Sequence, residues 1–179
     1  MGLWFADCHC RPGGVTIRIV DFRKKILTPA TLSAWRDALR GRGQKLVATN
    51  GCFDLLHIGH VSYLQEARRL GDALLVGITS DAGVRRLKGP GRPVNPQEDR
   101  AGVVAALQSV DAVFVFPELD ARHFLETVRP DVYAKGGDYT LDTINQDERR
   151  LLEKLGVKIV ILPGVPGKST SATLNQLKI

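Results

Sequence analysis

The stretch Thr49-Asn50-Gly51-Cys52-Phe53-Asp54-Leu55-Leu56-His57-Ile58-Gly59-His60 carries two histidines in a loop that joins two different patterns. The apolar run Leu46-Val47-Ala48 precedes it, and a helical pattern follows it to about Leu70. A loop between a strand and a helix lies at the helix N-terminus, where unpaired N–H groups and the positive end of the helix dipole favour an anion. We therefore expect a phosphate-bearing ligand at this loop, with Gly51 and Gly59 allowing the backbone to approach it closely.

The two histidines, His57 and His60, are spaced so that a helical path places both imidazoles on one side, where they can contact one group together. One alternative is structural, with one histidine capping the helix and the other packing. A zinc site is the second alternative, but no glutamate stands between the histidines, and Cys52 alone does not complete a ligand set. The whole pattern favours the phosphate interpretation, so we expect no metal held by protein ligands.

The same residues resemble a known signature. His57-Ile58-Gly59-His60, after Asn50-Gly51-Cys52-Phe53-Asp54, is similar to the HxGH motif of the nucleotidyltransferase superfamily, which also includes class I aminoacyl-tRNA synthetases. The longer string from Thr49 to Gly71 resembles the cytidylyltransferase-like family more closely. Within that family it is most similar to the adenylyltransferase domain that makes ADP-heptose from a heptose 1-phosphate. The resemblance covers roughly Lys25 to Ile179.

The remaining chain alternates between apolar runs and helical patterns. Its 179 residues favour one domain with a full core. We predict strands at 45–49, 73–79, 112–116, 131–134 and 157–162, and helices at about 28–39, 57–70, 81–88, 96–107, 121–128, 142–155 and after 169. This order predicts an α/β fold, a single-domain, doubly wound parallel sheet of the Rossmann-like nucleotidyltransferase kind, over residues 23–179. Residues 1–22 are interpreted as an N-terminal extension.

Composition narrows the class of partner and the compartment. The net charge of +6 indicates anionic partners, but the basic residues are dispersed and lack interleaved aromatic side chains, so we expect small phosphorylated substrates rather than nucleic acid. The three cysteines, Cys8, Cys10 and Cys52, form no even disulfide framework. No apolar segment has the length of a signal peptide or a bilayer span, so we expect a cytoplasmic protein without a membrane partner.

The resemblance assigns roles to single residues. It implies that His57 and His60 contact the triphosphate, and that Asn50 to Asp54 line the nucleotide cleft with Gly59. Lys88 stands where the family has a lysine that bridges the donor and acceptor phosphates, the alternative being a solvated loop lysine. Arg92 and Arg100 are weaker candidates for substrate binding, for which a solvated position is an equal alternative.

Two later motifs extend the resemblance. Lys135-Gly136-Gly137-Asp138-Tyr139 is similar to the KGGDY string of the heptose-phosphate adenylyltransferases, which implies nucleotide contacts at Lys135 and Gly136 and weaker substrate contacts at Gly137 and Asp138. Gly167-Lys168-Ser169-Thr170-Ser171 resembles the family's second nucleotide-binding signature, with Ser169, Thr170 and Ser171 as phosphate ligands or helix caps. The residues Val165-Pro166-Gly167 depart from the cytidylyltransferase pattern, which weakens a CTP assignment.

The chemistry of nucleotidyl transfer matches these residue types. An acceptor phosphate is already ionised at neutral pH, so no general base is needed, and positioning and charge stabilisation by histidines, lysines, a helix N-terminus and Mg²⁺ suffice. We expect transfer of AMP from ATP to a D-glycero-manno-heptose 1-phosphate, giving ADP-heptose and pyrophosphate for surface glycan synthesis. A CTP-dependent transferase acting on glycerol 3-phosphate or a similar polyol phosphate is the alternative enzyme.

Two readings outside this choice remain. A synthetase fragment matches Lys168-Ser169-Thr170-Ser171 only superficially, and a regulator that binds nucleotide without catalysis conflicts with the intact His57, His60 and Lys88. The family also implies a homodimer. A sugar kinase, fused to this domain in many bacteria, is expected to be encoded separately.

Overall fold

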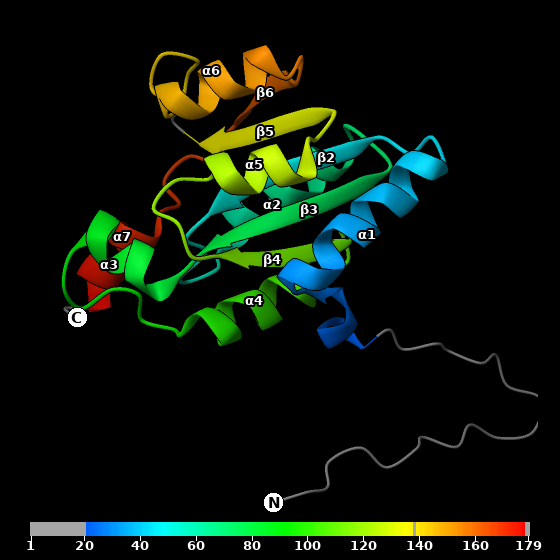
Figure 1. The fold of residues 1–179 in the computed structure, drawn as a ribbon. Helices are drawn as coiled ribbons and strands as arrows, with labels where there is room; N and C mark the ends of the chain where they lie inside the picture. Colours follow the sequence, from blue (N-terminus) through cyan, green and yellow to red (C-terminus); the bar gives the residue numbers. More distant parts are fainter. Residues whose placement is uncertain (1–20, 138, 178–179) are drawn as a thin grey trace, which may run out of the picture.

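The computed structural model describes residues 21–137 and 139–177. Within these ranges, six strands form one sheet in the order β1-β4-β3-β2-β5-β6, and every pairing is parallel (Figure 1). The predicted α/β fold with a parallel sheet is therefore confirmed. The strands are β1 (Ile26–Leu27), β2 (Leu46–Gly51), β3 (Ala73–Thr79), β4 (Ala112–Phe116), β5 (Val132–Gly137) and β6 (Lys158–Pro163).

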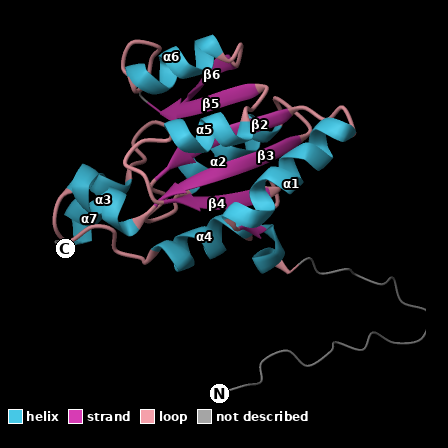
Figure 2. Cartoon of the chain, viewed as in Figure 1, coloured by secondary structure: helices cyan, strands magenta, loops and turns pink. Residues whose placement is uncertain are grey.

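Helices cover both faces of this sheet (Figure 2). One face packs against α1 (Pro29–Gly41), α5 (Arg122–Val128) and α6 (Gln146–Lys154), through side chains such as Leu32, Phe124 and Leu152. The other face packs against α2 (Ile58–Arg68) and α4 (Gln97–Ala105), through Leu64 and Val104 among others. Two further helices, α3 (Asp81–Lys88) and α7 (Thr170–Leu177), lie beyond the carboxyl ends of the strands (Figure 1).

The central strands are buried on both faces, which explains why continuous apolar runs predict them. All seven residues of β3 are buried, as expected for a strand covered by helices on both faces. The predicted bounds of this strand, 73–79, and of β4, 112–116, agree with the observed ones. Continuous apolar runs identify such doubly covered strands without any alternation.

The N-terminal edge differs from the prediction. A 3-10 helix (Phe22–Lys25) precedes β1, a strand of two residues that the sequence pattern does not predict. Asp21 caps this helix by accepting a hydrogen bond from the Arg23 N–H, and Phe22 packs against the α2–α4 face. Both Asp21 and Phe22 therefore belong to the folded unit. Residues 1–20 of the predicted extension, with Cys8 and Cys10, lie outside the described residues.

The path of the chain defines a ligand-binding edge. From β2 the chain runs through β3 to β4, and then returns to pair β5 with the other side of β2. In open α/β sheets this reversal leaves a crevice beyond the carboxyl ends of the two diverging strands. Asn50 and Gly51 on β2, and Lys135 and Gly136 on β5, lie at those ends.

Over the described residues, none of the helices combines the length and apolarity that crossing a bilayer demands.

Candidate active site

A cleft of about 1080 Å³ lies at this reversal point. Its walls come from the loop after β2, the start of α2, the loop after α3, the end of β5 and the start of α7. It brings together nearly all the residues predicted from sequence, although they are spread over more than 100 positions. Those lining it are Asn50, Gly51, Cys52, Phe53, Asp54, His57, Gly59, His60, Lys88, Arg92, Lys135, Gly136, Gly137, Ser169, Thr170 and Ser171.

The loop after β2 makes a tight turn into α2. Phe53 adopts a positive φ of 46°, a backbone conformation that costs energy for a residue with a side chain and recurs at functional sites. Its ring leaves little room at Gly51, where a Cβ would come within 3.0 Å of Phe53 Cε2. His57 then occupies the N-cap position of α2 in extended conformation. The turn therefore places the N-terminus of α2 at the cleft, which His57, Gly59 and His60 line.

The two histidines lie against each other at this helix start. Their ring centroids are 3.9 Å apart, and the backbone N–H of His57 donates to Nδ1 of His60 at 3.3 Å. Because Nδ1 of His60 accepts a hydrogen bond, the proton of the neutral ring resides on Nε2. His60 thus presents an Nε2–H donor, as a phosphate ligand requires.

Both imidazoles are held in the neutral form. Burial, together with the neighbouring His57, lowers the pKa of His60 to about 4. Burial and the positive charge of Lys168 also lower the pKa of His57. At neutral pH the pair therefore supplies hydrogen-bond donors without the cost of burying two like charges.

His57 lies close to Gly59 on α2 and to Lys168 in the loop before α7. A Cβ at Gly59 would lie 2.9 Å from His57 Nδ1 and 3.5 Å from Lys168 Cβ, so only glycine fits between them. Nδ1 of His57 is buried and, among the described residues, has no hydrogen-bond partner. A buried polar atom without a partner inside a cleft is one that a ligand can satisfy.

The start of α7 is tied to the same loop. The hydroxyl of Thr170 donates to the carbonyl oxygen of Leu55 at 3.0 Å, across 115 positions of sequence. Lys168, Ser169 and Ser171 line the cleft on either side of this contact. Thr170 therefore joins the two predicted nucleotide-binding motifs directly.

Lys135 is held at the opposite wall by Asn50. Its ammonium donates to the Asn50 side-chain oxygen at 2.7 Å and to the Asn50 backbone carbonyl at 3.2 Å. Burial lowers its pKa, and the negative charge of Glu148 opposes that shift. The adjacent Gly136 has a packing reason as well, because a Cβ there would collide with the ring of Tyr63. The KGGDY string thus holds a buried cation and a close approach between β5 and α2.

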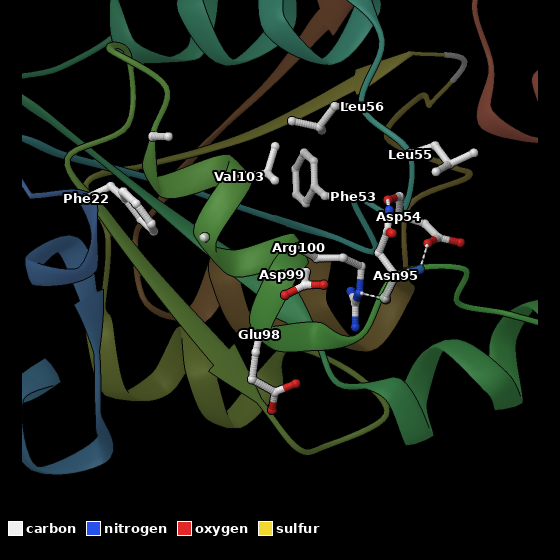
Figure 3. Close-up of a pocket in the computed structure, with 12 residues that line it drawn as sticks. Phe22, Phe53, Asp54, Leu55, Leu56, Asn95, Glu98, Asp99, Arg100 and Val103 are labelled. Atoms are coloured by element: carbon white, nitrogen blue, oxygen red, sulfur yellow. Dashed lines mark hydrogen bonds between the residues drawn. The ribbon is translucent and has the colours of Figure 1, made fainter. Parts of the chain in front are cut away.

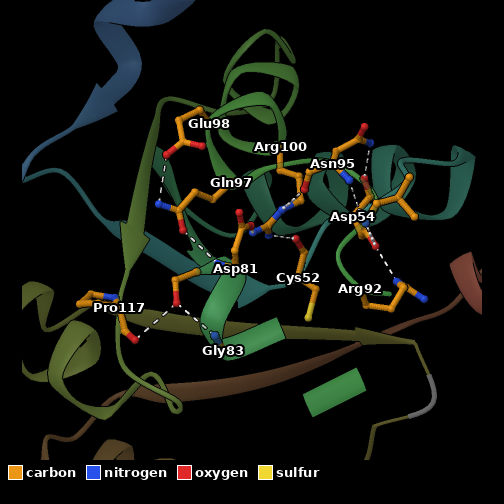
Figure 4. A network of polar contacts seen from close by, with 12 residues as sticks. Cys52, Asp54, Asp81, Gly83, Arg92, Asn95, Gln97, Glu98, Arg100 and Pro117 are labelled. Carbon is orange, nitrogen blue, oxygen red and sulfur yellow. Dashed lines mark hydrogen bonds and ion pairs between the residues drawn. The ribbon is translucent and has the colours of Figure 1, made fainter. Parts of the chain in front are cut away.

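Asp54 fixes the loop that follows α3. Its carboxylate accepts from Nε of Arg92 at 2.6 Å and from the backbone N–H groups of Val94 and Asn95 at 2.8 and 3.1 Å (Figure 4). Burial acts to raise the pKa of Asp54, but these hydrogen bonds outweigh it and the pKa is lowered. Lys88, at the end of α3, is exposed on the rim of the cleft.

Arg100 does not join the cleft, in contrast to the expected substrate contact. Its side chain is fully buried, and it donates to the carbonyl oxygens of Cys52 and Asn95 and to the carboxylate of Asp81 (Figure 4). All three guanidinium nitrogens are used by these bonds. Arg100 therefore holds the loop after β2 against α3 and α4, and the solvated alternative is excluded too. Asp138, the other weaker candidate, lies outside the described residues.

A second cavity, of about 610 Å³, lies behind the loop after β2, on the α4 side. Figure 3 shows Phe53, Leu56 and Val103 facing one another there, with Glu98 and Asp99 on α4 at its edge. It shares Phe53 and Asp54 with the cleft but contains neither histidine. The loop after β2 therefore separates the cleft from this second cavity.

Several cleft residues were not selected from sequence. Glu148, Asn145, Thr143 and Tyr63 line the wall near Lys135 and Gly136, and Lys168 lines the wall near His57. Lys168 belongs to the motif Gly167-Lys168-Ser169-Thr170-Ser171, so its place in the cleft could have been predicted from that motif. Glu148 sits in a charged helical segment with no local signal for burial, and only the fold brings it to the cleft.

The described residues offer no protein cage for a metal ion. Among them, no group of three or more histidine, cysteine or acidic side chains is arranged to hold one. Among the residues that the structure describes, the carboxylates lining the cleft are those of Asp54 and Glu148, and both already accept hydrogen bonds from N–H and O–H donors. The oxygen lone pairs of these two carboxylates are therefore largely committed to hydrogen bonds within the protein.

Curated relatives resemble most of this chain. Bifunctional protein HldE from Syntrophotalea carbinolica is 44% identical over 158 residues, which are 88% of this chain and 32% of that protein. Bifunctional protein HldE from Mesorhizobium japonicum is 49% identical over 147 residues, 82% of this chain and 28% of that protein. The chain thus spans about a third of the length of these relatives.

Solved structures share the fold. The lipopolysaccharide core biosynthesis protein from Thermoplasma volcanium matches with a TM-score of 0.58 at 29% identity, over 69% of this chain and 98% of that one. Pantoate-beta-alanine ligase from Francisella tularensis matches with a TM-score of 0.54 at 17% identity, over 82% of this chain and 68% of that one, which shows likeness of fold alone.

The family model described as cytidylyltransferase-like matches residues 48–175. This range starts inside β2 and ends inside α7, so it contains the histidine pair, the buried lysine and the Thr170 contact. The resemblance seen in the sequence is confirmed, and the chain belongs to the cytidylyltransferase-like family.

Proposed function

We propose that this chain is a nucleotidyltransferase that transfers AMP from ATP to a D-glycero-manno-heptose 1-phosphate, releasing pyrophosphate and giving ADP-heptose for surface glycan synthesis. The observation that carries the proposal is the neutral histidine pair at the N-terminus of α2, facing a cleft that also contains Lys168, Lys88 and Lys135. Hydrogen-bond donors and cations gathered in one cleft suit a triphosphate and a second phosphate.

The residues have separate tasks in this reaction. Nε2–H of His60 and the first N–H groups of α2 donate to phosphate oxygens of the nucleotide as charge develops on them. Lys168 adds positive charge beside His57. Lys88, on the rim, neutralises the acceptor phosphate. The acceptor oxygen attacks the α-phosphorus while the bond to pyrophosphate breaks, and no residue has to remove a proton.

Mg²⁺ enters this proposal as part of the substrate, MgATP. It supplies charge neutralisation of the triphosphate, and the fully engaged state of Asp54 and Glu148 is consistent with a metal that arrives on the nucleotide. The heptose assignment rests on the KGGDY string and on relatives named HldE, which are longer than this chain.

The test is pyrophosphate release with Mg²⁺, crossing ATP and CTP against heptose 1-phosphates of both anomers, glycerol 3-phosphate and phosphocholine. His60→Ala serves as the inactive control, and His123→Ala, an exposed histidine on α5, as the matched active control. Turnover confined to ATP with a heptose 1-phosphate is the expected result. Turnover with CTP and a polyol phosphate would replace it by the cytidylyltransferase alternative, and nucleotide binding without turnover on any pair would exclude both.

A further inference from the structure

Behind the cleft wall, a buried chain of polar contacts runs from α6 to the loop after β2. The carboxylate of Glu148 accepts from the backbone N–H of Ala121 at 2.9 Å, and its second oxygen lies 3.0 Å from the Tyr133 hydroxyl. The single proton of that hydroxyl is shared with the Asn50 side-chain oxygen, which lies 2.5 Å away and also accepts from Lys135 at 2.7 Å. Glu148, Tyr133 and Lys135 are all buried.

These contacts fix the orientation of the Asn50 amide. The amide oxygen faces two donors, the Tyr133 hydroxyl and the Lys135 ammonium. A flipped amide would turn its NH₂ group toward the ammonium and lose the bond from Lys135. The Lys135 ammonium therefore selects this orientation, and the Tyr133 hydroxyl holds the amide oxygen in it as a second donor.

The same chain contributes the counter-charge for Lys135. The titratable groups of the described residues that face this ammonium are the Glu148 carboxylate, the Cys52 thiol and the phenols of Tyr133 and Tyr139, whose ring centroids both lie 5.5 Å from it. Glu148 is the carboxylate among them. Burying an ammonium without a nearby anion favours its neutral form.

Lys135 keeps donor capacity for a ligand. An ammonium has three N–H groups, and Asn50 occupies two of them. Among the described residues the third has no acceptor, and Lys135 lines the cleft. A cation held this way contacts an anionic ligand only as long as it stays protonated and in place.

We propose that Tyr133 and Glu148 are positioning residues for the nucleotidyl transfer: Tyr133 orients Asn50, and Glu148 keeps the buried Lys135 charged, so that Lys135 presents a fixed cation to the phosphates of the substrates. Tyr133 thus acts on the position of the Asn50 amide, and Glu148 acts on the charge of Lys135. The expected loss of kcat/KM rests on the proposed function. The expected change in the protonation of Lys135 does not depend on it.

The kinetic test compares Glu148→Gln, Tyr133→Phe and the matched control Glu153→Gln, which alters an exposed carboxylate on the same helix. Both buried variants are expected to lose about tenfold or more in kcat/KM, the scale of a hydrogen bond to a charged group. Only Glu148→Gln is expected to move the high-pH limb of kcat/KM to lower pH, because it alone removes the anion. A limb that moves equally in both variants, or in neither, would overturn the assignment.

A second measurement works without turnover. The rate of acetylation of Lys135 by acetic anhydride, read by peptide mass spectrometry across pH, reports the fraction of neutral amine. Its onset is expected at lower pH in Glu148→Gln than in the wild type, Tyr133→Phe and Glu153→Gln, with thermal melts confirming that each variant is folded. An unchanged onset contradicts the inference even if the enzyme is active, whereas a shifted onset in a protein that turns over no substrate pair would reject the proposed function and keep the charge-balancing role.

Discussion

Nδ1 of His60 accepts a hydrogen bond from the backbone N–H of His57, 3.3 Å away, and this contact decides which ring nitrogen carries the proton. With Nδ1 occupied, His60 donates through Nε2. A glutamine amide can reach the position of Nε2, and an asparagine amide reaches only that of Nδ1. Comparing His60→Gln with His60→Asn therefore tests the role of the Nε2–H donor, because both variants remove the ring and only glutamine can place an N–H at the Nε2 position.

We expect His60→Asn to lower kcat by about 10²–10³, the usual loss when one donor to a developing anion is removed. His60→Gln should lose less, since its N–H can occupy the Nε2 position. Steady-state kinetics of both variants, beside His123→Asn on the exposed face of α5, checks this. An asparagine variant as active as the glutamine variant would contradict the assignment of the donor.

The histidine pair also makes stability depend on pH. Burial lowers the pKa of His60 to about 4, whereas the unfolded value is near 6.5. Between these values the unfolded chain binds a proton that the folded chain does not, so the free energy of unfolding falls as the pH falls through this window. Urea midpoints at several pH values should decline from pH 7 to pH 4, and less steeply in His60→Gln. Equal slopes would indicate that His60 is not held neutral.

Gly59→Ala tests the space beside His57. Alanine ordinarily stabilises a helix by about 0.5–1 kcal/mol over glycine, but here its Cβ would lie 2.9 Å from His57 Nδ1 and displace the ring. We expect kcat/KM to fall at least tenfold while the protein remains folded. Gly41→Ala in α1, where a Cβ meets nothing within 4 Å, is the matched control for kinetics and thermal melting. Unimpaired turnover in Gly59→Ala would show that His57 need not keep its position.

Asp54→Asn tests the anchor of the loop that follows α3. Removing the charge leaves Arg92 without its carboxylate and weakens the bonds from Val94 and Asn95, so we expect a loss of about 3 kcal/mol in unfolding free energy. The KM for the acceptor phosphate should rise, because the loop begins beside Lys88. Urea unfolding and acceptor titrations check both effects. Asp37→Asn, whose partner Arg40 is exposed, should change the unfolding free energy by no more than about 0.5 kcal/mol and should leave the KM for the acceptor unchanged.

The sequence predicted the central part of the fold well because local pattern and tertiary environment agree there. β3 is buried along its whole length, so its apolar run has no polar interruption. β1 has two residues, too few for any periodicity, and becomes a strand only by pairing with β4. The helix predicted from about 142 begins at Gln146, because Asn145 caps it by accepting from the N–H groups of Asp147 and Glu148.

The candidate site was predictable where residues adjoin one another in a motif and unpredictable where distant segments meet. The histidine pair and Gly59 lie together, so their joint position follows from helix geometry. Arg100 resembled any basic residue on a helix until the fold placed it against Cys52 and Asp81. The contact between Asn50 and Tyr133 joins positions 83 residues apart, and no local rule contains it.

The bond from Thr170 to Leu55 sets an order of events during synthesis. The ribosome delivers the histidine loop long before the segment that completes its wall, so the sheet can pair β2 with β3 and β4 while the cleft is still open on one side. A nascent chain stalled after β6 would hold the histidines and the Lys135 wall but neither Lys168 nor the Thr170 tether. The wall that contains Lys168 and Thr170 is therefore completed late, when α7 docks against the loop after β2.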